Sequence, residues 1–271
     1  MELMQFQYSN IPFIQISKFM TLQIYQYLLY TWIAIGIIAF PFLLKQTAPY
    51  GRHVTKGWGP MISNQLGWMI QEGVAPFFIS YWFWTGSLEK TNASYFFYSL
   101  YMAHYIYRSY IFPFRTKTKG KKIPLVICGS AVFFNFCNTF ILGYFLGNIG
   151  GNYDNEYFLT PQFIIGILVF ITGVFINVKS DNILIALRKP GETGYKIPTG
   201  FLFEYISCPN HFGEIIEWLG FAIMVGSLTA FSFPIWTIVN LLPRALDHHK
   251  WYLQKFADYP KERKAVVPFI L

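Results

Sequence analysis

A cluster of acids and amides lies inside an apolar stretch in the C-terminal third of the chain. The stretch GFLFEYISCPNHFGEIIEWLGFAI covers residues 200–223, and Asn210, Glu214 and Glu217 are spaced by four and three residues within it. This spacing places the three side chains on one face of a helix. A carboxylate inside a bilayer is costly unless it faces a polar cavity or pairs with a neighbouring helix. The cluster therefore indicates a site, although Glu217 alone could be a structural partner.

Other apolar segments also contain polar side chains that lipid would not solvate. Gln71 and Glu72 lie near the middle of one segment, and an acid at that depth has few structural uses. Structural alternatives stay open elsewhere, because Tyr105 is one of 19 tyrosines and the adjacent His248 and His249 could lie among lipid headgroups. The remaining polar residues of this kind are His104, Arg108, Asn177, Asp181 and Tyr252.

The basic residues near these segments could bind an anionic cofactor. Arg188, Lys189, Lys196 and Arg244 are suited to phosphate groups. The chain has no P-loop and no G-x-G-x-x-G, since GWGPMI at 57–62 begins that motif and fails. No group of His, Cys and carboxylates has the spacing of a metal site. A nucleotide would therefore need a pocket of a different kind, and no metal is expected.

The composition is that of a membrane protein. Hydrophobic residues make up 54% of the 271 residues and charged residues only 13%, whereas soluble domains carry about 25% charge. A membrane-spanning helix needs roughly 20 mostly apolar residues. We therefore expect an all-α, polytopic membrane protein with seven transmembrane helices at about 23–44, 61–85, 93–114, 123–147, 161–186, 211–227 and 229–252.

The positions of Lys and Arg predict the orientation of these helices. Loops 45–60, 115–122 and 187–210 and the tail from residue 244 are basic, whereas 148–160 has no Lys or Arg. Basic loops stay on the cytoplasmic side, so the N-terminus is predicted outside and the C-terminus in the cytoplasm. No cleavable signal is expected in the first 22 residues. The chain would reside in a bacterial inner membrane or the endoplasmic reticulum.

The net charge of +8 could suggest nucleic acid. The basic residues instead lie at the ends of the spans, where they fix topology and meet lipid headgroups. No nucleic-acid partner is expected, and no obligate protein partner is evident. Cys128, Cys137 and Cys208 have neither metal nor redox spacing. One membrane-embedded domain over residues 1–271 is therefore predicted.

Three long motifs resemble the C-terminal signature of steroid 5α-reductases. They are RKPGETGYKIPTG at 188–200, the stretch 200–223 described above, and the ending HHKWYLQKFADYPKERKAVVPFIL at 248–271. The pairs QE at 71–72 and HY at 104–105 also lie where that family has them. The resemblance implies a seven-helix membrane oxidoreductase that transfers a hydride from NADPH to carbon 5 of a 3-oxo-Δ4 steroid.

The resemblance also implies roles for individual residues. Glu72 and Tyr105 would bind the 3-keto oxygen, with Gln71 beside them on the substrate side. Residues 23–147 would form mainly the substrate side and 161–271 mainly the NADPH side. The residues expected at the NADPH site are Asn177, Asp181, Arg188, Tyr195, Lys196, Asn210, Glu214, His248 and Tyr252.

Two positions depart from the animal enzymes of that family. Lys196 stands where they have Arg, which predicts a weaker or different phosphate contact. Cys128 stands where they tend to have Arg before Gly, which puts one substrate or cofactor contact in question.

Three other functions fit parts of the sequence. A related membrane reductase could act on a polyprenol or an enoyl-CoA with the same cofactor half. A membrane methyltransferase is a second possibility, against which the dense reductase-like ending argues. A channel or transporter is a third, but broken half-helices and paired repeats are not evident.

Overall fold

The computed structural model describes residues 20–54, 57–116, 118, 120–151, 153–189, 192 and 194–271. Residues 1–19, where no signal was expected, and the loop residues Lys56, Lys117 and Lys119 lie outside the described residues. The described chain is mostly helical, as predicted. Its seven helices of 15 or more residues are α2 (Leu22–Lys45), α3 (Asn64–Thr85), α4 (Asn92–Ile106), α6 (Leu125–Tyr144), α7 (Pro161–Ala186), α8 (Pro209–Val225) and α9 (Leu228–Lys255).

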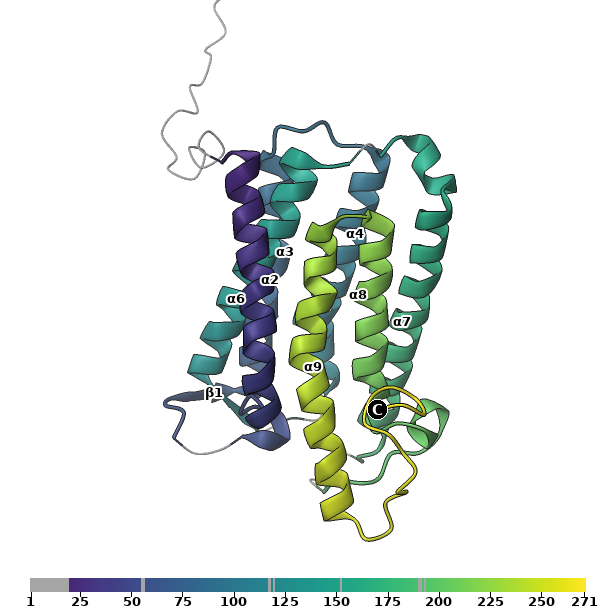
Figure 1. Cartoon of the computed structure of the whole chain (residues 1–271). Coiled ribbons are helices and arrows are strands. Elements are labelled where there is room, and N and C mark those ends of the chain that lie inside the picture. Colours follow the sequence, from purple (N-terminus) through teal and green to yellow (C-terminus); the bar gives the residue numbers. More distant parts are fainter. Residues whose placement is uncertain are drawn as a thin grey trace, which may run out of the picture.

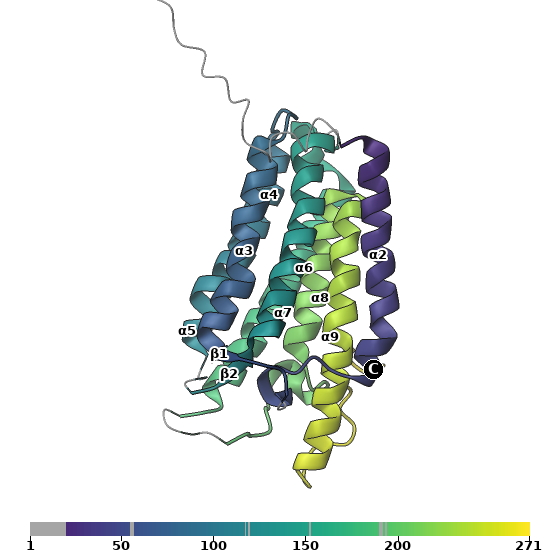
Figure 2. The same cartoon turned by 90° about the vertical axis from the view of Figure 1, so that its left-hand side faces the viewer.

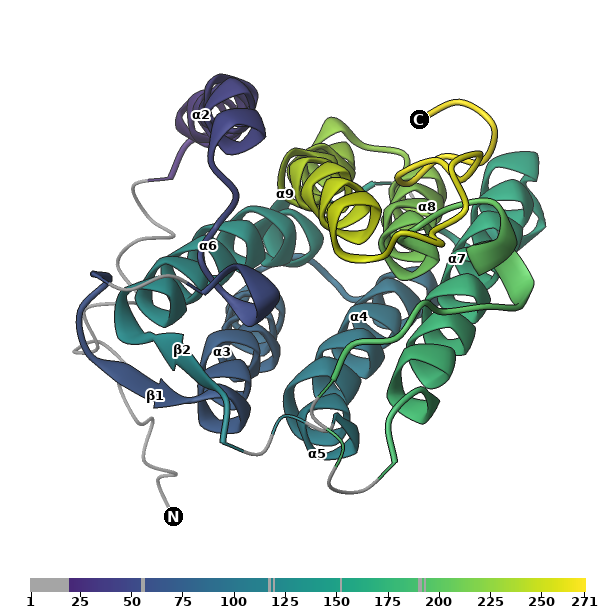
Figure 3. The same ribbon diagram turned by 90° about the horizontal axis from the view of Figure 1, so that it is seen from below.

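The long helices run alternately up and down one bundle (Figures 1 and 2). As a result, the loops after α2 and α7 and the C-terminal tail lie at the same end as the short strands. The loops around 86–91 and 150–160 lie at the opposite end. Seen from below, α2 lies at the edge of the bundle beside α9 (Figure 3). The basic loops identified in the sequence therefore share one end of the molecule.

Three described helices are long and apolar enough to cross a membrane: Leu22–Lys45, Leu125–Ile149 and Pro161–Ala186. Their apolar side chains are largely exposed; Phe42 is 68% exposed and Phe133 65% exposed. Such a surface fits a bilayer rather than water. The chain is therefore a membrane protein, and among these three helices α7 also contains Asn177 and Asp181, near its end.

Hydroxyl side chains determine where most of these helices begin. Thr21, Ser63, Thr91, Thr160 and Ser227 each precede a helix, and each accepts a hydrogen bond from the backbone N–H three residues further on. These bonds satisfy donors that the first helical turn leaves free. The helix boundaries therefore follow from local sequence.

The expected ranges 61–85 and 123–147 were wrong at their starts. Residues Met61–Ser63 form strand β1, which pairs antiparallel with β2 at Lys122–Pro124. The pairing satisfies backbone groups at the entrances of α3 and α6, which pack closely together. The third expected helix is also interrupted, because a π-helical segment at Tyr107–Ile111 separates α4 from the short helix α5 at Phe112–Arg115.

Helices α7 and α8 touch through glycines. A Cβ atom added to Gly173 would lie 2.1 Å from the backbone nitrogen of Glu217, and one added to Gly213 would lie 2.4 Å from that of Asn177. Only residues without a side chain allow two helix backbones to approach so closely. This contact brings the polar residues of the two helices face to face.

The C-terminal segment folds back beneath α8 and α9 (Figure 1). The Ser207 hydroxyl lies 2.6 Å from the Tyr259 hydroxyl and 2.7 Å from His249 Nδ1. The buried Arg263 donates to the Pro198 carbonyl at 2.9 Å. These bonds hold the loop before α8 against the end of α9.

Candidate functional site

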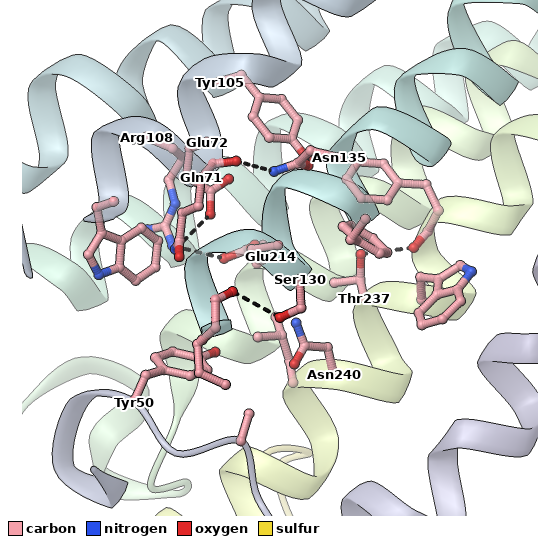
Figure 4. Close-up of a pocket in the computed structure, with 18 of the residues that line it drawn as sticks. Tyr50, Gln71, Glu72, Tyr105, Arg108, Ser130, Asn135, Glu214, Thr237 and Asn240 are labelled. Atoms are coloured by element: carbon pink, nitrogen blue, oxygen red, sulfur yellow. Dashed lines mark hydrogen bonds and ion pairs between the residues drawn. The ribbon is translucent and has the colours of Figure 1, made fainter. Parts of the chain in front are cut away.

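A cavity of about 390 Å³ opens between α3, α4, α6, α8 and α9. Its lining is mostly apolar, and volumes of this order hold small ligands in other proteins. Figure 4 shows the polar groups that face it. They include Gln71, Glu72, Tyr105, Asn135, Glu214 and Thr237.

Glu72 and its neighbours form the charged corner of this cavity. The Gln71 amide donates to Glu72 Oε1 at 3.3 Å. Arg108, from the π-helical segment, lies with Nη2 3.9 Å from Glu214 Oε2 and with Nη1 3.6 Å from Asp181 Oδ2. π-Helical turns often occur at functional sites, where they redirect a side chain. One buried guanidinium therefore links acids from two helices, α7 and α8.

Tyr105 lies on the wall of the same cavity and is 4% exposed. Its hydroxyl donates to Asn135 Oδ1 at 3.2 Å, and Asn135 Nδ2 donates to the backbone oxygen of Gln71 at 2.7 Å. The pair predicted to hold a carbonyl group, Glu72 and Tyr105, therefore faces one cavity. Asn135 was missed because nothing in its local sequence distinguishes it from a structural amide.

A second cavity of about 250 Å³ adjoins the first, and its lining includes Arg52, Lys121 and Arg188 from the basic loops. The two share five lining residues, namely Tyr50, Trp68, Arg108, Glu214 and Leu241. A ligand in the second cavity can therefore meet a ligand in the first beside Arg108 and Glu214.

The predicted amide and acid cluster lies between these cavities and the α7–α8 contact. Asn210 Nδ2 donates to Asp181 Oδ1 at 3.2 Å, and Asn177 Nδ2 donates to the Asn210 carbonyl at 2.9 Å and to Glu214 Oε2 at 3.5 Å. The Glu217 side chain contacts α4 instead of this cluster, since its Oε1 lies 2.6 Å from His104 Nδ1. Of the expected cofactor residues, Asp181, Arg188, Tyr195, Asn210, Glu214 and His248 line the second cavity.

The loop between α2 and α3 contributes residues that sequence analysis did not assign to the site. The Arg52 guanidinium lies over the rings of Tyr195, Trp251 and Tyr252, at 5.2, 4.6 and 4.9 Å from their centroids. It also donates to the Tyr252 hydroxyl at 3.5 Å. Tyr252 therefore joins the site through Arg52, which itself lines the second cavity.

The same loop places His53 against the end of α9. His53 Nε2 lies 2.7 Å from His248 Nδ1, and the two rings stack. Burial, followed by the charge of Arg244, lowers the pKa of His53 to about 4. The imidazole is therefore neutral near pH 7.

Lys196 and Cys128 lie outside both cavities, as do the expected cofactor residues Asn177 and Tyr252. Lys196 forms an exposed ion pair with Glu192 at 2.7 Å and lines neither cavity. Cys128 is buried, and its sulfur lies 3.0 Å from where a Cβ on Gly67 would stand. Lys196 is drawn to Glu192, its i,i+4 neighbour. Cys128 is held where α6 packs closely against Gly67 of α3.

The side chains around the second cavity suit an anionic, hydrogen-bonding cofactor. Within the described part of the chain, buried Arg52 Nη1, Arg244 Nη1 and His211 Nδ1 have no hydrogen-bond partner. All three residues line this cavity. Buried groups of this kind normally have partners, so they are available to a ligand with phosphate or carbonyl oxygens.

Fold and site together define a membrane-embedded helical protein with an apolar cavity joined to a polar, cation-rich one. Known sequences identify its family. The profile of 3-oxo-5-alpha-steroid 4-dehydrogenase matches residues 121–271. The steroid 5-alpha-reductase DET2 of Gossypium hirsutum is 39% identical over 253 residues, which are 91% of this chain and 97% of that protein. The 3-oxo-5-alpha-steroid 4-dehydrogenase 1 of Homo sapiens is 36% identical over 245 residues, covering 90% and 94%.

The chain therefore belongs to the 3-oxo-5-alpha-steroid 4-dehydrogenase family. Its members are oxidoreductases, which implies a nicotinamide cofactor. The resemblance noted in the sequence is confirmed.

Proposed function

We propose that this protein reduces the Δ4 double bond of a 3-oxo-Δ4 steroid by hydride transfer from NADPH to carbon 5. The observation that carries this proposal is the junction of the two cavities. Glu72 and Tyr105 face the apolar cavity, and Arg108 and Glu214 line the boundary with the polar one. The apolar lining of the first cavity suits a steroid ring system, and the cations of the second suit an anionic nucleotide.

The proposed NADPH site combines cations for phosphates with amides and acids for ribose and nicotinamide. Arg52, Arg188 and Arg244 line the polar cavity and are suited to phosphates. Asp181, Asn210 and Glu214 would hold hydroxyl or amide groups. Asn177 and Tyr252 support them, through Asn210 and Arg52 respectively. Lys196 would act only indirectly, since it pairs with Glu192. When bound, NADPH supplies the hydride.

On the substrate side, the residues stabilise charge and orient the enone. Hydride addition at carbon 5 moves negative charge onto the 3-keto oxygen, and carbon 4 then takes up one solvent-derived proton, which completes the reduction of the double bond. The Tyr105 hydroxyl would donate a hydrogen bond to that oxygen, with the Glu72 carboxyl group beside it. Gln71 keeps Glu72 oriented through its amide. The apolar lining excludes water, which strengthens these interactions.

We propose seven membrane spans with the N-terminus outside and the C-terminus in the cytoplasm. The basic loops share one end of the bundle with the polar cavity, so NADPH would bind from the cytoplasmic side. The steroid would enter laterally from the bilayer. In this arrangement residues 23–147 serve mainly the substrate and 161–271 mainly NADPH, within one domain of a bacterial inner membrane or the endoplasmic reticulum.

A panel of substrates tests this function. Detergent-solubilised protein should oxidise NADPH with progesterone or testosterone, which yield the 5α-reduced products. Enoyl-CoA and polyprenol substrates serve as comparisons. Faster turnover of either comparison substrate would contradict steroid reduction, although it would leave the cofactor site intact.

A further inference from the structure

Asn135 on α6 contacts the hydroxyl that the proposed function assigns to the substrate carbonyl. Both Asn135 and Tyr105 are buried, at 3% and 4% exposure, and their hydrogen bond is 3.2 Å long. Asn135 also bonds to the backbone oxygen of Gln71, the residue before Glu72. It therefore bonds directly to the Tyr105 side chain and to the backbone beside Glu72 (Figure 4).

The direction of these hydrogen bonds is fixed by chemistry. The Gln71 carbonyl oxygen can only accept, so the Asn135 nitrogen must face it. The Asn135 oxygen then faces Tyr105, and because an amide oxygen also only accepts, Tyr105 must be the donor. A tyrosine hydroxyl has one proton, and the hydrogen bond to Asn135 uses that proton.

On its other side, Tyr105 packs against Tyr101. The rings of Tyr101 and Tyr105 stack with centroids 4.6 Å apart. Asn138 Nδ2 donates to the Tyr101 hydroxyl at 3.4 Å. The hydroxyl of Tyr105 keeps Asn135 Oδ1 as the acceptor of its proton.

We propose that Asn135 is a positioning residue that holds the Tyr105 proton in the ligand-free protein and competes with the substrate carbonyl for it. This inference rests on the proposed function of Tyr105. Substrate binding exchanges the Tyr105–Asn135 hydrogen bond for one from Tyr105 to the keto oxygen, and product release restores the first bond. Asn135 thus lowers affinity for the ketone and favours release of the product.

Replacement of Asn135 by Leu tests the competition, because Leu is of similar size and cannot accept the proton. Without Asn135, the Tyr105 proton is no longer held by an amide oxygen and is free for the ketone. A neutral hydrogen bond corresponds to roughly a 2- to 12-fold change in an equilibrium constant, so the steroid dissociation constant should fall by about that factor. A purely structural role would instead weaken binding.

Two further variants complete the test. Thr139→Val removes a buried hydroxyl of the same helix that bonds only to backbone oxygens of Asn135 and Phe136, so its steroid affinity should match the unmodified protein. In a Tyr105→Phe background, Asn135→Leu should have no effect on affinity, because there is no proton to compete for. Asn135→Ala replaces Asn135→Leu if the latter does not fold.

The measurement is steroid binding to the detergent-solubilised, NADP⁺-loaded protein by equilibrium dialysis with labelled progesterone. Weaker or unchanged affinity in Asn135→Leu, or the same change with and without the Tyr105 hydroxyl, would overturn the role of Asn135. Absence of steroid-dependent NADPH oxidation by the unmodified protein would instead refute the proposed function.

Discussion

The close contact between α7 and α8 predicts that Gly173→Ala damages the cofactor site from a distance. The added Cβ would lie 2.1 Å from the Glu217 nitrogen and 2.5 Å from its Cα. Ordinary contact begins at 3.4 Å, so the backbones must separate by about 1.3 Å, the difference between these distances. Overpacking of this kind costs about 1–3 kcal/mol.

Separation of the backbones should also break side-chain hydrogen bonds between α7 and α8. The Asn177–Asn210 bond of 2.9 Å would lengthen past 4 Å, beyond hydrogen-bonding distance. Asp181 and Asn210 would lose their contact in the same way. Losing the alignment of these groups should weaken NADPH binding about tenfold or more.

Gly129→Ala in α6 is the matched control, because an added Cβ there meets no atom within 4 Å. Alanine favours the helix over glycine, so this variant should be as stable as the unmodified protein or more so. NADPH affinity is measured by fluorescence titration, and stability by thermal unfolding in detergent. Normal NADPH affinity in Gly173→Ala would refute the coupling between helix contact and cofactor site.

Four other predictions follow from the same geometry. Tyr105→Phe should slow hydride transfer about a hundredfold in single-turnover experiments and leave NADPH affinity unchanged, because one oxyanion donor is lost. Arg52→Ala should raise the NADPH dissociation constant about tenfold, whereas substitution of the exposed Lys250 should not. The pKa of His53 in the folded protein lies below its ordinary 6.5, so the unfolded protein takes up this proton at a higher pH than the folded protein does. The free energy of unfolding therefore falls as the pH drops from 6.5 toward 4. In His53→Gln, the melting temperature should depend less on pH over that range. A reporter fused after Leu271 should be active in the cytoplasm, and activity on the other side would contradict the orientation.

The sequence predicted the parts of the fold and site that depend on local pattern. Apolar runs located all seven long helices, and Ser and Thr caps explain where five of them begin. The spacing of Asn210 with Glu214 placed that pair on one helical face, and Asn177 and Asp181 of α7 are likewise four residues apart. Those faces do meet, because glycines let α7 and α8 touch.

The parts that the sequence did not predict depend on contacts between distant segments. The β1–β2 pairing joins residues about 60 positions apart. Arg52 enters the site because its loop folds onto α9, and Asn135 because α6 packs against α3 and bonds to Tyr105 of α4. Lys196 matched a family position by sequence, yet Glu192, four residues before it, provides a nearer partner.

The fate of a labelled hydride tests the central claim most directly. The purified protein is incubated with progesterone and NADPH deuterated at nicotinamide C4, and the product is analysed by mass spectrometry and NMR. We predict one deuterium at carbon 5 of a 5α-reduced product. Unconsumed NADPH, or deuterium at the carbonyl carbon instead of carbon 5, would contradict the account.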